Sequence, residues 1–326
     1  MPSAAHTPAP SAPDGRIVAR GIGLYCFAIV LLSVMDAMIK WMSAGYPTVQ
    51  IVFFRSLFGL APLVFVVARS GGLAALATRR WGAHLARGLI GVCAALAFFH
   101  AFSVMPLADA YAIAFASPLF ITALSVPLLR ESVGPRRWAA VAVGFGGVVV
   151  MLRPGSAGLD GLLQAGAAAA LVGTICFAVS VVLIRRLART ETNAAIVFHS
   201  GLVAVAASAL LLPFGFVLPG LVDFLLLAAI GLIGGTGAIA MTAAFRSTPV
   251  AILAPFEYTA MIWAVVLGFA FWGDLPDRYV WIGCAIVVAS GLYILHRETR
   301  RGGTLDVAPR AVPKPAGTAS APSEAP

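Results

Sequence analysis

Charged side chains are scarce in this sequence. They make up 11% of its 326 residues, whereas 60% of the residues are hydrophobic. An average soluble domain carries roughly 25% charged residues, so the composition excludes an ordinary soluble domain. The formal net charge is +9, but the basic residues lie in short clusters between apolar runs. Because they form no basic face with interleaved aromatic residues, the sequence predicts no nucleic-acid partner.

Cysteine is also sparse, and the motifs of several enzyme classes are missing. The four cysteines all lie in apolar runs without a CxxC pair, which favours apolar packing over metal binding: Cys26, Cys93, Cys176 and Cys284. There is no HExxH, GxSxG, P-loop or His/Asp cluster. The sequence therefore predicts no cofactor, no metal and no catalytic residues. The alternative of an integral membrane enzyme acting on lipid-like substrates is disfavoured, and so is a channel, because no ring of like residues is visible.

Long apolar runs fill the chain between two segments rich in Pro, Ala and Ser, residues 1–16 and 302–326, which we predict to be disordered tails. A bilayer core about 30 Å thick needs roughly 20 apolar residues per helix. The runs predict an all-α integral membrane protein with ten transmembrane helices, of which the fifth and tenth are short. The expected spans are 20–42, 48–68, 84–104, 107–129, 136–152, 161–184, 194–217, 221–244, 250–272 and 279–296.

The distribution of basic residues gives the ten spans an orientation, because Lys and Arg accumulate in cytoplasmic loops. With the N-terminus inside, the outer segments contain only Lys40, Arg153 and Arg278. The inner segments then contain Arg16, Arg20, Arg69, Arg79, Arg80, Arg87, Arg130, Arg136, Arg137, Arg185, Arg186, Arg189, Arg246, Arg297, Arg300 and Arg301. A missing or extra helix would scramble this alternation. We therefore expect a multi-pass protein of the inner (cytoplasmic) membrane with both termini in the cytoplasm.

The chain contains an internal repeat at a separation of about 143 residues. The stretch from Phe102 matches the stretch from Phe245 without a gap, so that Pro106 aligns with Pro249 and Trp138 with Trp281. Two five-helix units follow, residues 17–153 and 160–296, and an odd number of helices inverts the second unit in the membrane. The loop "RESVGPRR" is basic, whereas its counterpart "GDLPDR" is acidic on balance. Inverted repeats place a substrate site between the halves near the midplane, as in carriers that work by alternating access.

The repeat and its ending resemble the drug/metabolite transporter superfamily, and within it the EamA family. The likeness is clearest in "SPLFITALSVPLLRESVGPRRWAAVAVGFGGVVVMLRPG" and "PFEYTAMIWAVVLGFAFWGDLPDRYVWIGCAIVVASGLYIL". The stretch "MDAMIKWMS…YPTVQIVFFRSLF" resembles the subgroup of S-adenosylmethionine uptake carriers and riboflavin importers. The resemblance implies secondary active transport of a small organic metabolite, with the lipid bilayer as the other partner. It names no substrate, direction or coupling ion, and it leaves a homodimer open.

Three charged residues lie between Ser33 and Phe58, within the first two apolar runs. Asp36 and Lys40 are four residues apart, so they share a helix face and can pair. Lys40 lies near the end of its span, where it can instead extend to the headgroups as an interfacial anchor. Arg55 lies at a depth similar to that of Asp36 and must face a partner or water, because arginine stays charged. It either pairs with Asp36 or holds an anionic group of the substrate.

Glu257, in "APFEYTA", is the deepest carboxylate of the second half. We expect the helix to bend near Pro255 and Glu257 to line the cavity, where it would bind substrate or carry a coupling proton. The alternative is a fixed partner for Arg55. Tyr111 and Tyr258 either stack on a planar solute or pack in the bundle. His100 and Asp109 flank the short turn at Pro106, where a structural pair is expected.

Overall fold

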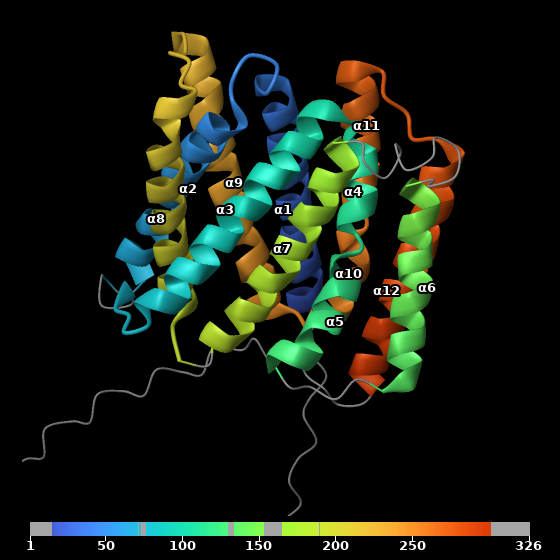
Figure 1. The fold of residues 1–326 in the computed structure, drawn as a ribbon. Helices are drawn as coiled ribbons and strands as arrows, with labels where there is room; N and C mark the ends of the chain where they lie inside the picture. The colour runs from blue at the N-terminus through green and yellow to red at the C-terminus, as the bar shows by residue number, and fades with distance from the viewer. Residues whose placement is uncertain are drawn as a thin grey trace, which may run out of the picture.

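The computed structural model describes residues 15–70, 72, 76–129, 134–152, 165–188 and 190–300 (Figure 1). The predicted tails fall outside the described residues, except that the first helix begins at Gly15. Within the described part the secondary structure is helical, and it contains no β-strand. The prediction of an all-α protein is therefore confirmed.

Twelve α-helices and a short 3₁₀ helix follow one another along the described chain. Their bounds are α1 Gly15–Met42, α2 Thr48–Ser70, α3 Trp81–Val104, α4 Leu107–Ala114, α5 Ser117–Leu129, α6 Pro135–Leu152, α7 Ala165–Leu187, α8 Asn193–Leu211, η3 Leu212–Phe214, α9 Leu221–Ser247, α10 Val250–Glu257, α11 Ala260–Trp272 and α12 Arg278–Arg300.

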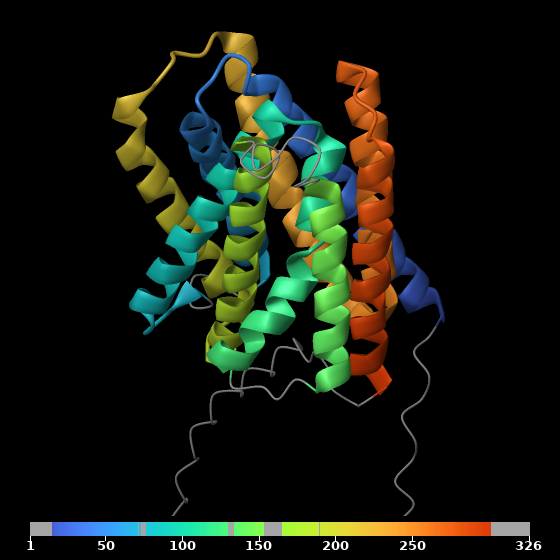
Figure 2. The same cartoon turned by 45° about the vertical axis from the view of Figure 1, so that its right-hand side comes forward.

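These helices provide the ten predicted membrane spans. Eight segments of the described chain are long and apolar enough to cross a bilayer, and two shorter apolar helices, 138–151 and 278–294, are the predicted short fifth and tenth spans. The start of α1 and the end of α12 lie at the same end of the bundle (Figures 1 and 2). This placement is what an even number of crossings requires.

Two spans of the described chain are each built from two short helices. The fourth span breaks between α4 and α5 at Phe115, and the ninth breaks between α10 and α11 at Tyr258 and Thr259. At both breaks the backbone switches to tighter hydrogen bonds between residues three apart, such as Ala116 N to Ile113 O (3.0 Å) and Thr259 N to Phe256 O (3.0 Å). The sequence predicted a bend at Pro255, but α10 continues through it for two more residues.

The packing of the helices follows the inverted repeat. Helix α1 packs on α9 as its counterpart α7 packs on α3, and α2 packs on α9 as α8 packs on α3. The tetrapeptide GLIG occurs at Gly88 in α3 and at Gly231 in α9. A Cβ atom on Gly88 would lie 2.5 Å from Val203 Cβ of α8, and one on Gly231 would lie 2.5 Å from Phe58 Cβ of α2. Equivalent glycines thus allow equivalent close contacts in the two halves.

Helices α6 and α12, the last of each half, cross at small residues. A Cβ atom on Gly147 would lie 2.8 Å from the carbonyl oxygen of Gly283, so the two backbones touch. Nearby, the Ser290 hydroxyl donates a hydrogen bond to the carbonyl oxygen of Ala140 at 2.6 Å. A shift of 143 residues converts the pair Gly147 and Gly283 into the pair Ser290 and Ala140. The crossing therefore lies on the pseudo-twofold axis that relates the repeats.

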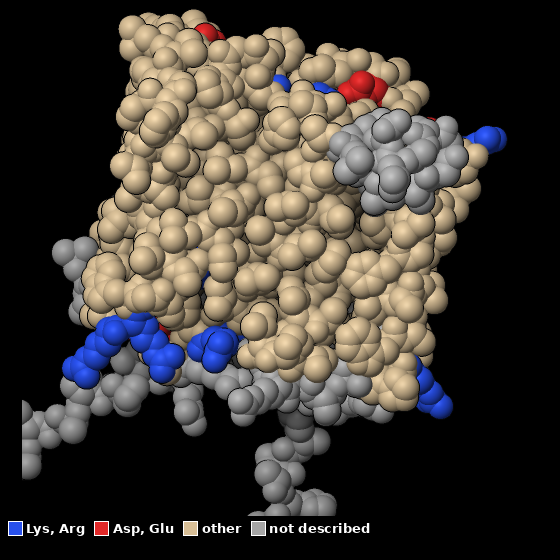
Figure 3. Space-filling model, viewed as in Figure 1, with Lys and Arg blue, Asp and Glu red and all other residues tan. Residues whose placement is uncertain are grey.

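The surface of the bundle is apolar along its sides and charged at its ends. Figure 3 shows a wide uncharged band, with Lys and Arg gathered mainly along the lower edge and acidic residues near the upper edge. Large apolar side chains are exposed on this band, such as Phe65 and Ile262 at 58% and 60%. This distribution is the one expected for helices surrounded by hydrocarbon.

The crossing of α6 and α12 can be tested with two neighbouring glycines. We expect Gly147→Leu to lower the melting temperature of the purified protein by several degrees, because overpacking a tight contact typically costs about 1–3 kcal/mol. Gly146 is exposed, and a Cβ atom there would meet nothing within 4 Å. Gly146→Leu is therefore the matched control and should melt close to wild type. Equal melting temperatures for the two variants would contradict the crossing.

Candidate functional site

The interior of the first half holds an acidic residue bound by a tyrosine. The Tyr111 hydroxyl on α4 donates a hydrogen bond to the Asp36 carboxylate on α1 at 2.6 Å. A hydrogen bond to a carboxylate is one of the stronger kinds, and it fixes α4 against α1 at this depth. Both residues stand out in the sequence, but nothing in their spacing predicts the hydrogen bond between them.

Arg55, on α2, balances the charge of Asp36 at a distance. The two groups interact electrostatically, but no ion pair within 4.0 Å joins them in the described structure. The guanidinium carbon lies 5.6 Å from the centre of the Phe99 ring on α3. Its Nε atom is buried and has no hydrogen-bond partner among the described residues. The Nε–H donor of Arg55 is thus unsatisfied in this conformation.

A row of aromatic rings connects this site to the second half. It runs Phe99, Phe102, Tyr111, Phe115 and Tyr258, with successive ring centroids 6.3, 6.1, 6.3 and 5.2 Å apart. Its last two members occupy equivalent positions, because Phe115 follows α4 and Tyr258 follows α10. The row therefore passes from one broken span to the other and links the two repeats at their interruptions.

Glu257 lies at the far end of this row as the last residue of α10. Part of the residue is exposed, but its carboxyl group is surrounded by protein where α10 packs against α1 and α12. The carboxylate interacts electrostatically with the hydroxyls of Tyr25 and Tyr258, and no ion pair or hydrogen bond of its side chain occurs within the described part. Since an intramembrane carboxylate normally faces a hydrated space, Glu257 meets the requirement for a cavity wall. Its suggested alternative role as the partner of Arg55 is not observed.

Lys40 contacts neither Asp36 nor the lipid headgroups, the two alternatives that the sequence predicted. Its ammonium group donates hydrogen bonds to Asp274 Oδ2 at 2.8 Å and to the Met105 carbonyl at 3.0 Å, and it lies 5.0 Å from the centre of the Trp272 ring. Lys40 is therefore neither paired with Asp36 nor extended to the headgroups. It joins α1 to the loop between α11 and α12 at the acidic end of the bundle. No sequence spacing relates positions 40 and 274, which is why this contact was missed.

The remaining polar candidates lie near the same end. His100 is exposed near the end of α3, and Asp109 is half-buried in the first turn of α4. Their pairing stays a prediction. In the loop after α1, Tyr46 donates a hydrogen bond to Asp223 at 2.7 Å, and this bond raises the pKa of Tyr46. Sequence reasoning also missed Tyr25 beside Glu257, since a tyrosine in an apolar run is usually a packing residue.

Nothing in this arrangement resembles a reaction centre. The described residues contain no group of three or more metal-ligating side chains, and the site combines opposite charges with aromatic faces rather than a nucleophile with a base. Fold and site together define a membrane carrier made of two inverted five-helix repeats. The chain belongs to the EamA-like transporter family, whose model matches residues 19–153 and again 164–295.

Characterised relatives cover most of the chain. The pseudopaline exporter CntI of Pseudomonas aeruginosa (strain UCBPP-PA14) is 30% identical over 86% of this chain and 97% of its own length. The riboflavin transporter of Rhizobium johnstonii is 28% identical over 83% of this chain and 89% of its own length. The S-adenosylmethionine uptake transporter of Rickettsia prowazekii is 25% identical over 86% of this chain and 94% of its own length. The chain is accordingly a transporter, and the enzyme alternative has no support.

A solved crystal structure shares the fold. It superposes with a TM-score of 0.60 at 22% sequence identity, over 87% of this chain and 98% of the other. At this identity the likeness concerns the arrangement of helices alone.

The balance of charge between Asp36 and Arg55 can be tested by removing each partner. Asp36→Asn leaves Arg55 without a counter-charge, and Arg55→Gln does the same to Asp36, so each single variant should lower the yield of folded protein. The double variant should recover part of the loss, because both charges are then gone. Monodisperse protein measured by size-exclusion chromatography provides the readout. Additive losses in the double variant would show that the two charges do not stabilise each other.

Proposed function

We propose that this protein is a secondary active transporter whose substrate site is lined by Asp36, Arg55, Tyr111, Glu257 and Tyr258. The observation that carries the proposal is the aromatic row, which connects the Asp36 and Arg55 charges of the first repeat with Glu257 of the second. Rocking of the inverted repeats would expose such a site to either side in turn. The broken spans give each half a flexible point next to the site.

Within this site, we assign Arg55 to an anionic group of the substrate and Glu257 to a cationic group or a coupling proton. Arg55 offers its unpartnered Nε atom, and Glu257 offers a carboxylate that has no basic partner among the described residues. Tyr111 and Tyr258 would stack on apolar parts of the substrate. The relatives are named for pseudopaline, riboflavin and S-adenosylmethionine, and they include both an exporter and uptake transporters. The proposal therefore concerns a small organic metabolite moved in either direction.

We also propose that the protein resides in the inner membrane with both termini in the cytoplasm. The support is the bias of Lys and Arg toward one end of the bundle (Figure 3), which is the end where α1 begins and α12 ends (Figure 1).

This orientation predicts the labelling of single cysteines in a variant without native cysteine. Gly220 precedes α9 at the acidic end, and Thr190 follows α7 at the basic end. A cysteine at position 220 should react with a membrane-impermeant maleimide in intact cells, whereas a cysteine at position 190 should react only after permeabilisation. Labelling of position 190 in intact cells would reverse the proposed orientation.

The role of Glu257 is tested by Glu257→Gln, which keeps the size of the side chain but removes its charge. Because an amide is easier to bury than a carboxylate, the variant should fold and insert. Uptake driven by a proton gradient into proteoliposomes should fall at least tenfold, whereas substrate exchange should survive if Glu257 carries only the proton. Asp223→Asn, which removes a carboxylate bound to Tyr46 at the outer end of α9, is the matched control.

Wild-type uptake with unchanged pH dependence in a folded Glu257→Gln protein would remove Glu257 from the site. Loss of both uptake and exchange would assign it to substrate binding as well as to coupling.

A further inference from the structure

We propose that a recess beside Glu257 is a subsite for the apolar ring of an organic cation, so that the substrate combines a positive charge with an aromatic or similarly bulky apolar group. The inference rests on the proposed function and specifies the substrate class that its site accepts. Four observations carry it: the shape of the recess, its connection to Glu257, the charge at that position and the chemistry of the walls.

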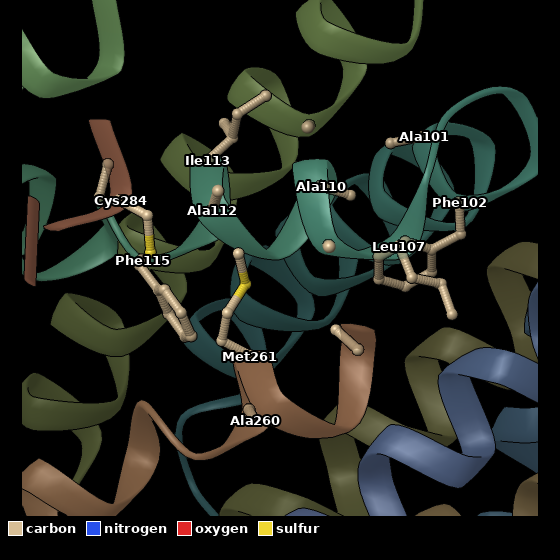
Figure 4. Close-up of a cluster of buried hydrophobic side chains, with 14 of the residues drawn as sticks. Ala101, Phe102, Leu107, Ala110, Ala112, Ile113, Phe115, Ala260, Met261 and Cys284 are labelled. Atoms are coloured by element: carbon tan, nitrogen blue, oxygen red, sulfur yellow. The ribbon is translucent and has the colours of Figure 1, made fainter. Parts of the chain in front are cut away.

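The recess has a volume of about 300 Å³ and lies between the two broken spans and α12. Phe115 and Tyr258, the equivalent residues of the two breaks, form part of its wall, together with Met261, Trp281 and Cys284. Figure 4 shows Phe115, Met261 and Cys284 lying close together from three different segments of the chain. The walls are aromatic, aliphatic or sulfur-containing, so the space suits a ring or another apolar group.

Tyr258 connects the recess to the carboxylate. Its hydroxyl interacts electrostatically with both Glu257 and Cys284. Its ring contacts Phe115 at a centroid distance of 5.2 Å and an interplanar angle of 77°. A ligand in the recess therefore lies next to Tyr258, within one residue of Glu257. Glu257 itself does not line the recess, so the charged group of the ligand must extend past Tyr258 to meet the carboxylate.

The electrostatics of Glu257 select a cation. The carboxylate has no basic partner in the described structure, whereas Asp36 is balanced by Arg55. Glu257 is also the last residue of α10, where the partial negative charge of the helix end adds to its own. The rings of Tyr25 and Tyr258 lie nearby, and the faces of aromatic rings attract cations. A neutral ring gains none of these electrostatic attractions, so it should bind weakly. A small hydrophilic cation gains them but does not fill the recess.

The recess borders the bilayer, so a lipid chain is the competing occupant. Ile262 and Trp281 line it and are 60% and 48% exposed. A lipid chain would be held by apolar contact alone and would be indifferent to the charge at position 257. The dependence of binding on that charge therefore separates the two occupants.

The test uses Cys284 as a built-in reporter in the full-length protein in detergent, after Cys26→Ser, Cys93→Ser and Cys176→Ser. Three probes of related shape are compared: phenyltrimethylammonium, tetramethylammonium without the ring, and tert-butylbenzene without the charge. Two quantities are measured with each probe, the rate at which N-ethylmaleimide alkylates Cys284 and the melting temperature. Phenyltrimethylammonium should slow alkylation and raise the melting temperature, since a ligand that binds the folded state stabilises it. The other two probes should do neither at the same concentration.

Single substitutions test whether phenyltrimethylammonium binds in the recess beside Glu257. Glu257→Gln should weaken the binding of phenyltrimethylammonium about tenfold or more, as expected for the loss of one interaction with a charged group, whereas Asp223→Asn should leave binding unchanged. Ala285→Leu fills the recess and should reduce binding. Ala289 lies one turn further along α12, is also exposed and does not line the recess. Ala289→Leu should therefore leave the binding of phenyltrimethylammonium unchanged.

Equal protection by tert-butylbenzene, unaffected by Glu257→Gln, would overturn the proposal in favour of a lipid-filled groove. Equal protection by tetramethylammonium would remove the ring subsite. A change in melting temperature without protection of Cys284 would place the cation elsewhere and would also overturn it. These are binding measurements, so they can fail while Glu257→Gln still abolishes uptake. Conversely, if phenyltrimethylammonium protects Cys284 but the wild-type protein shows no gradient-driven uptake, the proposed transport function is contradicted and the subsite is not.

Discussion

An ionised side chain placed in hydrocarbon costs at least about 2.5–3.5 kcal/mol, and the interior of this bundle is arranged around that cost. Asp36 accepts a hydrogen bond from Tyr111 and is balanced by Arg55, whose guanidinium lies against Phe99. These contacts draw α1, α2, α3 and α4 together at one depth. Glu257 is the exception, because its carboxylate has no basic partner in the described part of the chain. A charge left in this condition requires water, a proton or a ligand.

The two halves are alike where their helices pack and different in the charged residues of the proposed site. Gly88 and Gly231 allow matching helix contacts, and the α6 and α12 crossing maps onto itself under the repeat. The charges do not follow this symmetry: a shift of 143 residues places Ala114 opposite Glu257. Small residues thus preserve a common scaffold, while divergence at the ends of the two short helices gives the second repeat a carboxylate that the first lacks.

The sequence predicted the ten spans from hydropathy, and it predicted the inverted repeat from the match between the stretches that begin at Phe102 and Phe245. It also selected Asp36, Arg55 and Glu257, since charges in apolar runs are conspicuous. It did not predict the break after α4, although Pro118 provides a signal: its missing N–H leaves the carbonyl of Ala114 without its helical partner. The contact between Lys40 and Asp274, 234 residues apart, follows from tertiary packing and has no local signal.

The proposed transport mechanism requires Glu257 to line a hydrated site that is reached in turn from both sides of the membrane. The most direct test is the reaction of Glu257→Cys, in a variant without the native cysteines, with a charged methanethiosulfonate reagent applied from either face of oriented proteoliposomes. The account predicts reaction from both faces, since alternating access brings water to position 257 from each side. Reaction from neither face, or from a single face under all conditions, would contradict it.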